Sequence, residues 1–153
     1  MAGKDPEGDE EREASTIKVL VVDDHQMVRQ GLRLLMESEP DMMVAGEAAS
    51  GREMLRRLRE RPWDVMVLDI TLPDCCGLDL LGDVRAARPD MPVVILSMHS
   101  AAEYAEEALA RGAAGFVAKE DAASEVVEAV RTVARGGTYV SGLAAEGGEP
   151  MGF

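Results

Sequence analysis

The chain has 153 residues, the size of one ordinary domain, and 46% of them are apolar, which is enough for a hydrophobic core. Its formal net charge of −13 argues against a nucleic-acid surface on this chain, because phosphates repel an acidic partner. No apolar run approaches the roughly 20 residues that span a bilayer, and the polar N-terminus is no signal peptide, so we expect a cytoplasmic protein without a membrane partner.

The chain begins with an acidic tail and continues into five short apolar runs. We expect residues 1–15 to be disordered, since they are polar and strongly charged. Several of the apolar runs are nearly continuous, which is typical of strands covered on both faces of a parallel sheet. The five predicted strands are 17–22, 42–48, 64–70, 92–98 and 115–119.

The segments between these runs have the apolar spacing of helices. In the first, Val28, Leu32 and Met36 recur every four residues. The fourth, 101–113, approaches its end at Gly112, and the last, 122–137, stops at a pair of glycines, both of which are signals for the end of a helix. Strand–helix alternation repeated five times predicts an α/β, doubly wound (βα)5 fold with a five-stranded parallel sheet.

Polar side chains follow the predicted strands where each strand ends. Asp23 and Asp24 follow the first strand, Asp69 lies near the end of the third, Ser97 near the end of the fourth and Lys119 at the end of the fifth. Ligands of open parallel sheets bind beyond the carboxyl ends of the strands, so we expect these groups to meet at one edge. Clustered carboxylates favour Mg²⁺, which binds a few carboxylates together with waters and phosphate oxygens.

This set of groups suits reversible phosphorylation. An aspartate can act as a nucleophile toward phosphorus, Mg²⁺ and Lys119 can neutralise the charge, and the Ser97 hydroxyl can donate to a phosphoryl oxygen. Each residue taken singly also has an ordinary explanation: an aspartate as a helix N-cap or turn residue, the lysine as a surface charge and the serine as a loop hydroxyl. The order and spacing of the whole set favour the functional interpretation.

At these residues the chain resembles the receiver domain of bacterial two-component response regulators, over about 17–140. The resemblance rests on "VVDDHQMVRQGL", "DVMVLDITLPDCCGLDLL", "VVILSMHS" and "ARGAAGFVAKE". The residues "DDHQMVRQGL" and the stretch "LSMHSAAEYAEEALARGAAGFVAK" are most similar to the NarL/FixJ (LuxR-type) subfamily. The resemblance implies a flavodoxin-like fold with strand order 2-1-3-4-5 and a receiver domain over 16–140. Residues 141–153 would then be a flexible tail or a truncated linker.

The resemblance also implies a role for each matching residue. Asp69 would be the phosphoacceptor. Asp24, Asp69 and the backbone carbonyl of Thr71 would ligate Mg²⁺ directly, and Asp23 would act mainly through water. Lys119 would contact the phosphoryl group and Asp69. Ser97 would be the switch hydroxyl.

The switch implied by the resemblance adds one aromatic residue and a set of partners. Phe116 would turn inward as Ser97 moves toward the phosphoryl group, which would change the face formed by 101–113, 115–119 and 122–137. The donor would be a sensor histidine kinase, and phosphorylation would promote a homodimer through this face or through the first and last helices. Thr71 and His99, each two residues past a site residue, would tune the rate of phosphoryl loss.

Some residues depart from the commonest receiver pattern. Glu120 follows Lys119 where many receivers have proline, Phe116 replaces the more frequent tyrosine, and Cys76 precedes the loop glycine. We interpret the adjacent Cys75 and Cys76 as free thiols in a reducing compartment, since two neighbouring cysteines form no disulfide framework. A redox influence on phosphorylation is the alternative for this pair.

Alternative functions stay open at this point. A Mg²⁺-dependent phosphatase or phosphotransferase would use the same aspartate nucleophile, but it would carry a second aspartate where Thr71 stands. A pseudo-receiver that is never phosphorylated is disfavoured by the complete set of acids and Lys119. The chain is either the receiver part of a transcription regulator, whose DNA-binding helix-turn-helix domain is missing here, or a stand-alone receiver that acts through protein contacts.

Overall fold

The computed structural model describes residues 16–98 and 102–141, so the predictions for residues 1–15, for His99 and for residues 142–153 lie outside it. The strands are β1 (Ile17–Val22), β2 (Met42–Ala48), β3 (Val65–Asp69), β4 (Val93–Ser97), β5 (Gly115–Ala118) and β6 (Tyr139–Val140). The helices are α2 (Gln26–Glu37), α3 (Gly51–Leu58), α4 (Gly77–Ala87), α5 (Ala102–Ala110) and α6 (Ala122–Ala134), with a short 3₁₀ turn, η1 (Lys119–Asp121).

All neighbouring strands of the sheet are parallel, in the order β2-β1-β3-β4-β5-β6. The predicted order 2-1-3-4-5 is therefore confirmed. The predicted number of five strands is wrong, because a two-residue strand, β6, adds to the free edge of β5. It escaped prediction because it is so short and follows Gly136–Gly137, which resembles the start of a linker.

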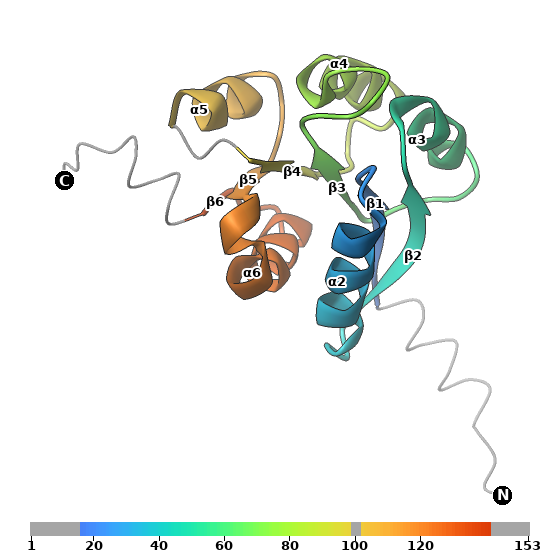
Figure 1. The fold of residues 1–153 in the computed structure, drawn as a ribbon, viewed down its shortest axis with the longest axis vertical. Helices are drawn as coiled ribbons and strands as arrows, with labels where there is room; N and C mark the ends of the chain where they lie inside the picture. Colours follow the sequence, from blue (N-terminus) through green and yellow to red (C-terminus); the bar gives the residue numbers. More distant parts are fainter. Residues whose placement is uncertain (1–15, 99–101, 142–153) are drawn as a thin grey trace, which may run out of the picture.

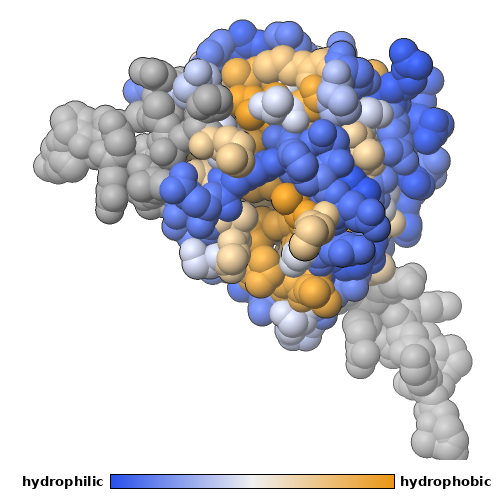
Figure 2. All heavy atoms as spheres, viewed as in Figure 1, coloured by the Kyte–Doolittle hydropathy of each residue, from blue (hydrophilic) through white to orange (hydrophobic). Residues whose placement is uncertain are grey.

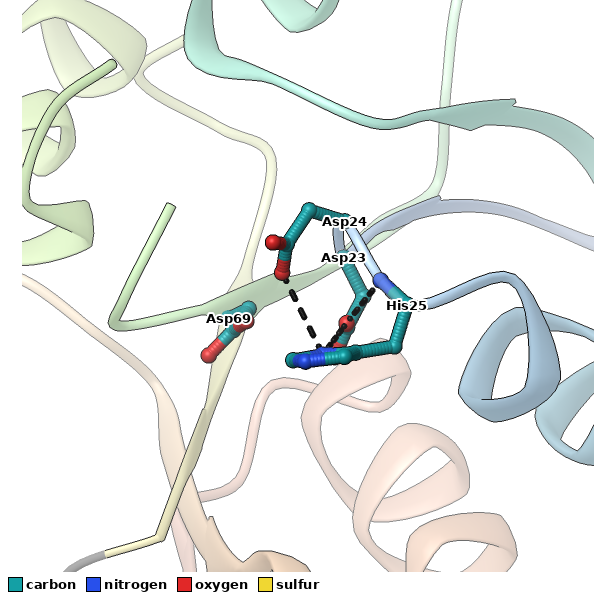
Figure 3. A group of neighbouring side chains, drawn as sticks. All are labelled: Asp23, Asp24, His25 and Asp69. Atoms are coloured by element: carbon teal, nitrogen blue, oxygen red, sulfur yellow. Dashed lines mark hydrogen bonds and ion pairs between the residues drawn. The ribbon is translucent and has the colours of Figure 1, made fainter. Parts of the chain in front are cut away.

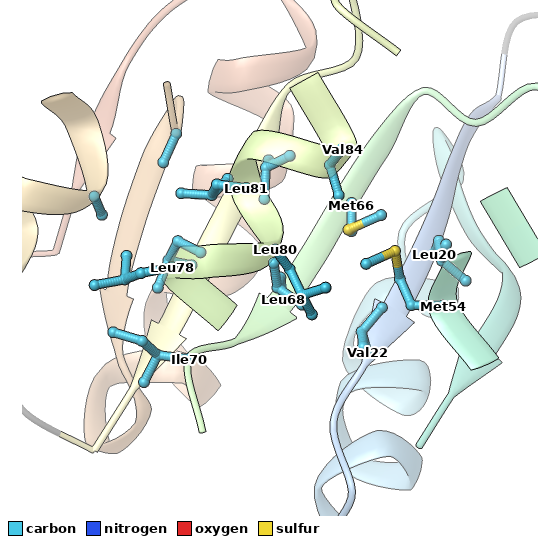
Figure 4. Packing of buried hydrophobic residues seen from close by; sticks show 14 of the residues in the cluster. Leu20, Val22, Met54, Met66, Leu68, Ile70, Leu78, Leu80, Leu81 and Val84 are labelled. Carbon is cyan, nitrogen blue, oxygen red and sulfur yellow. The ribbon is translucent and has the colours of Figure 1, made fainter. Parts of the chain in front are cut away.

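Helices cover both faces of the sheet, as the continuous apolar runs predicted. Figure 1 shows α3, α4 and α5 on one face and α2 and α6 on the other. Every residue of β3, β4 and β5 is buried between these layers. Alternate strand residues point to opposite sides and form two separate cores, one with Leu20, Met66 and Leu68 (Figure 4) and the other with Val21, Val67 and Leu96.

Helix ends follow local rules of backbone chemistry. Ser50 caps α3, since its side chain accepts a hydrogen bond from the Glu53 N–H. Gly112, just after α5, and Gly136, just after α6, have φ values of 107° and 92°, which only glycine adopts at low cost. Both predicted helix stops are confirmed. Within the described residues, no helix is long and apolar enough to cross a membrane.

Candidate functional site

Two buried aspartates form the floor of the site. Asp23 directly follows β1 and Asp69 ends β3, and their side chains are 0% and 2% exposed. Apolar strands carry both residues into the interior, since the last four residues of β1 and all of β3 are buried. The strands are neighbours in the sheet, so their ends bring these two carboxylates together.

Asp24 and His25 lie beside the buried pair at the surface. One ligand atom from each of Asp23, Asp24, His25 and Asp69 lies within 4.8 Å of the others. Figure 3 shows these four side chains gathered at the ends of the strands. The structure therefore brings the three predicted carboxylates together. It also adds a histidine that we did not predict to be part of the site.

His25 contacts both neighbouring aspartates. Its Nδ1 lies 3.0 Å from Asp23 Oδ1 and 3.2 Å from Asp24 Oδ1, and its backbone N–H also donates to Asp23 Oδ1 at 2.9 Å. Its position in the sequence, directly after Asp23 and Asp24 and just before α2, could have indicated that His25 belongs to the site.

Lys119 bridges the two buried carboxylates. Its Nζ lies 2.9 Å from Asp23 Oδ2 and 3.3 Å from Asp69 Oδ2, and its side chain is only 11% exposed. Burial disfavours the ammonium, but its contacts with the negatively charged Asp23 and Asp69 outweigh this and raise the pKa of Lys119. The lysine therefore stays charged at neutral pH and holds the two acids together.

Opposing influences act on the pKa of the Asp69 carboxyl. Burial raises its pKa above the ordinary aspartate value, and the negative charge of Asp23 adds to this. The Thr71 N–H, which donates to Asp69 Oδ1 at 3.1 Å, and the Lys119 ammonium oppose the shift. The buried Oδ2 atoms of Asp23 and Asp69 contact the Lys119 ammonium, but neither accepts a well-aligned hydrogen bond from the described residues.

The buried oxygens fit a bound cation. Two carboxylates share one ammonium at the floor of the site, and the exposed Asp24 adds a third carboxylate above them. One lysine leaves this cluster with a net negative charge, which a divalent ion would neutralise. Carboxylate oxygens with open access to water are the donor set that Mg²⁺ uses.

The remaining predicted residues occupy different depths. Ser97 ends β4 and is fully buried. Phe116 on β5 is also fully buried in the core on the α3–α5 side, so the structure shows the inward position, and its predicted rotation stays a prediction. Thr71 is exposed and lies just past Asp69.

The loop after Asp69 packs against α3. The Asp74 carboxylate accepts hydrogen bonds from the backbone N–H groups of Gly51 and Arg52 at the start of this helix. Cys75 is half-buried there, and burial raises the pKa of its thiol, so it holds less of the reactive thiolate. Cys75 and Cys76 are free thiols, as predicted, and Cys76 is exposed.

A hollow of about 600 Å³ lies at the other end of the sheet. It is lined mostly by residues at the amino ends of strands and in the loops before them, such as Ile17, Trp63 and Pro92, and by none of the residues of the carboxylate cluster. Ligands of doubly wound sheets bind at the carboxyl ends, so we assign the chemistry to the cluster and not to this hollow.

Comparison with known families decides the identity. Residues 19–131 match the response regulator receiver domain family, which covers most of the chain. The chain belongs to this family. The matched span runs from β1 into α6 and includes every residue of the carboxylate cluster.

The receiver domain resembles curated transcription regulators and solved receiver structures. It is 41% identical over 125 residues to the transcriptional regulatory protein UhpA of Salmonella typhimurium, which is 82% of this chain and 62% of UhpA. Over 129 residues it is 37% identical to the DNA-binding transcriptional activator DevR/DosR of Mycobacterium tuberculosis, covering 84% of this chain and 59% of that protein. The chain thus spans about three fifths of the length of these relatives.

A solved structure supports the same assignment. A LuxR-family two-component response regulator from Aurantimonas sp. SI85-9A1 superposes with a TM-score of 0.82 at 34% identity, covering 86% of this chain and 94% of that one. The chain is therefore the signalling receiver domain of a response regulator of LuxR/NarL type.

Proposed function

We propose that Asp69 accepts a phosphoryl group from the phosphohistidine of a sensor histidine kinase in a Mg²⁺-dependent reaction. The convergence of three carboxylates and Lys119 at the carboxyl ends of β1, β3 and β5 is the observation that carries this proposal. Asp69 is the best nucleophile because Thr71 and Lys119 orient its carboxylate from two sides.

Asp23, Asp24 and Asp69 would hold the metal, joined by the backbone carbonyl of Thr71. Bound Mg²⁺ would supply positive charge for the oxygens of the transferring phosphoryl group. The chain's own residues would do the positioning. Lys119 would contact a phosphoryl oxygen, and the Ser97 hydroxyl would donate to another.

The transfer itself is a simple displacement at phosphorus. An oxygen of the Asp69 carboxylate attacks, the new P–O bond forms and the P–N bond to the kinase imidazole breaks. The electron pair of the broken bond stays with the imidazole, which takes up a proton. The resulting acyl phosphate is later hydrolysed by water, at a rate that Thr71 and His99 would tune.

The output would be a change of shape on the α5–β5–α6 face. Ser97 and Phe116 lie on adjacent strands that feed this face, and movement of Ser97 toward the phosphoryl group would change the packing next to Phe116. Because the relatives UhpA and DevR/DosR are named as transcription regulators and extend beyond the matched region, we propose control of transcription through a DNA-binding helix-turn-helix domain. The alternative is a stand-alone receiver that acts through protein contacts.

A phosphorylation-dependent homodimer would follow, through the α5–β5–α6 face or through α2 and α6. Met27 and Leu34 on α2 are 83% and 75% exposed and lie seven residues apart, hence on one side of the helix. In Figure 2, hydrophobic surface is visible over the part of the molecule that contains α2 and α6. This apolar stripe favours the second surface.

The test is incubation of the chain with acetyl phosphate and Mg²⁺, followed by intact mass. One phosphoryl adduct on the wild type, absent from Asp69→Ala and from a sample without divalent metal, is the expected result. An adduct that persists in Asp69→Ala would contradict the assignment, and no adduct with any donor would favour a pseudo-receiver. Light scattering before and after phosphorylation tests the dimer.

A further inference from the structure

A fully buried serine, Ser141, directly follows the edge strand β6. The Tyr139 N–H donates to the Ala114 carbonyl at 3.1 Å, and the Ser141 N–H donates to the Phe116 carbonyl at 2.9 Å. Tyr139 packs against the core on the α2–α6 side and Val140 against the core on the other side. Ser141 is 0% exposed although it lies at the last described position of the chain.

The Ser141 side chain makes one specific contact with β5. Its Oγ accepts a hydrogen bond from the Ala118 N–H at 3.2 Å, and this bond is buried. Buried backbone donors need an acceptor, so the Ala118 amide depends on this hydroxyl for its position. A side-chain hydroxyl at position 141 is therefore required for this contact.

Ala118 adjoins two residues of the proposed phosphorylation site. It is the register partner of Ser97 on β4, and it directly precedes Lys119, which contacts Asp69. Ser141 is thus separated from both Ser97 and Lys119 by a single residue of β5. Asp69 contacts Lys119, Lys119 is bonded to Ala118 in the chain, and the Ala118 N–H donates to Ser141, so these contacts connect Asp69 to Ser141.

The order of the strands sets the direction of the effect. Asp69 ends β3, which lies on the β4 side of β5, while β6 lies on the opposite side. A phosphoryl group on Asp69 would draw Lys119 and Ser97 toward β3. The Ala118 peptide would move with them, away from Ser141, and β6 has only a short ladder to hold it against β5.

We propose that Ser141 is a positioning residue that couples phosphorylation of Asp69 to release of β6 and of Ser141 from β5. This coupling rests on the proposed function. Because coupling between two sites is reciprocal in free energy, a partner that holds β6 away from β5 would in turn favour the phosphorylated state of Asp69. Departure of β6 from the sheet would then be a second output of phosphorylation, in addition to the change of shape on the α5–β5–α6 face.

The first arm of the test uses the unphosphorylated chain. Hydrogen exchange of the Ala118 amide should rise at least about threefold in Ser141→Ala relative to the amides of β1, which report global opening. Ser141→Thr, which keeps the hydroxyl, should restore slow exchange. Tyr139→Phe on β6 is the matched control, since it removes only the hydrogen bond that the Tyr139 phenol donates to Glu125 of α6. Unchanged Ala118 exchange in Ser141→Ala would overturn the contact.

The second arm adds acetyl phosphate and Mg²⁺. Exchange of the amides at 139–141 should rise on phosphorylation of the wild type. Ser141→Ala should raise the phosphorylated fraction reached at limiting acetyl phosphate, and Ser141→Thr should return it to the wild-type value. A phosphorylated wild type with unchanged exchange at 139–141 would overturn the coupling alone. Absence of any phosphoryl adduct on the wild type would overturn the proposed function and the coupling with it.

Discussion

Lys119 lies closer to Asp23 than to Asp69, with Nζ–Oδ2 distances of 2.9 Å and 3.3 Å. The lysine is thus a shared counter-ion for two buried acids. Transfer of a phosphoryl group to Asp69 would replace one of these acids with a larger, more negative group. The same ammonium then serves first to hold the site together and afterwards to stabilise the product.

Loss of the lysine should cost folding stability. Lys119→Met leaves Asp23 and Asp69 buried without a cation, and removal of one partner from a buried ion pair costs about 3–5 kcal/mol. Urea unfolding without divalent metal measures the loss, and Mg²⁺ should recover part of it. Lys18→Met, at the opposite end of β1, is the control. A loss below about 1 kcal/mol would mean that the pair behaves like a surface ion pair.

Removal of the Asp69 charge should stabilise the protein in a pH-dependent way. Its raised pKa means that the folded state binds a proton more tightly than the unfolded state does, so this group's contribution to stability falls as pH rises from about 4 through the folded pKa. Asp69→Asn has no ionisable group at this position and therefore lacks this pH-dependent contribution to stability.

The melting temperature of Asp69→Asn should therefore exceed that of the wild type at neutral pH, by about 2–4 °C for each kcal/mol gained. The difference should shrink toward pH 4 and also on addition of Mg²⁺. Thermal unfolding in metal-free buffer over a pH series measures both effects. A difference that grows as the pH is lowered would contradict the raised pKa.

His25 should bias the choice of metal. Imidazole nitrogen favours first-row transition metals over Mg²⁺, and the His25 ring lies among the carboxylates. We expect His25→Ala to weaken Mn²⁺ or Co²⁺ binding by roughly tenfold and Mg²⁺ binding much less. Titration calorimetry measures each ion, with the neighbouring Gln26→Ala as control. Equal losses for all ions would show that His25 only positions Asp23.

Two glycines on α4 should respond in opposite ways to alanine. At Gly77, an added Cβ would lie 2.5 Å from the Asp69 carbonyl oxygen and 2.8 Å from the Ile70 Cα, so the backbone beside the phosphoacceptor must shift. Gly77→Ala should lose about 1–3 kcal/mol and weaken Mg²⁺ binding. At Gly82 nothing lies within 4 Å, and Gly82→Ala should gain about 0.5–1 kcal/mol. Chemical denaturation of both variants checks the contrast, and a neutral Gly77→Ala would contradict it.

Much of the fold could be predicted because its signals are local. The continuous apolar runs indicated strands buried on both faces, and Gly112 and Gly136 marked helix ends through a backbone conformation that other residues adopt only at a cost. Strand β6 could not be predicted in this way, because two residues carry no periodic pattern. It forms only because β5 offers an open edge and two cores accept Tyr139 and Val140.

The chemical groups of the site and the strand ends that carry them can be read directly from the amino-acid sequence: the acids at 23, 24 and 69, Ser97 and Lys119. Their contacts with one another depend on the packing of the strands. This packing pairs Lys119 with Asp23, brings the His25 ring against the acids and lets the Ser141 hydroxyl accept from the Ala118 N–H. The physical reason is that burial and hydrogen-bond partners depend on which strands are neighbours, and contacts between residues distant in the chain leave no local pattern.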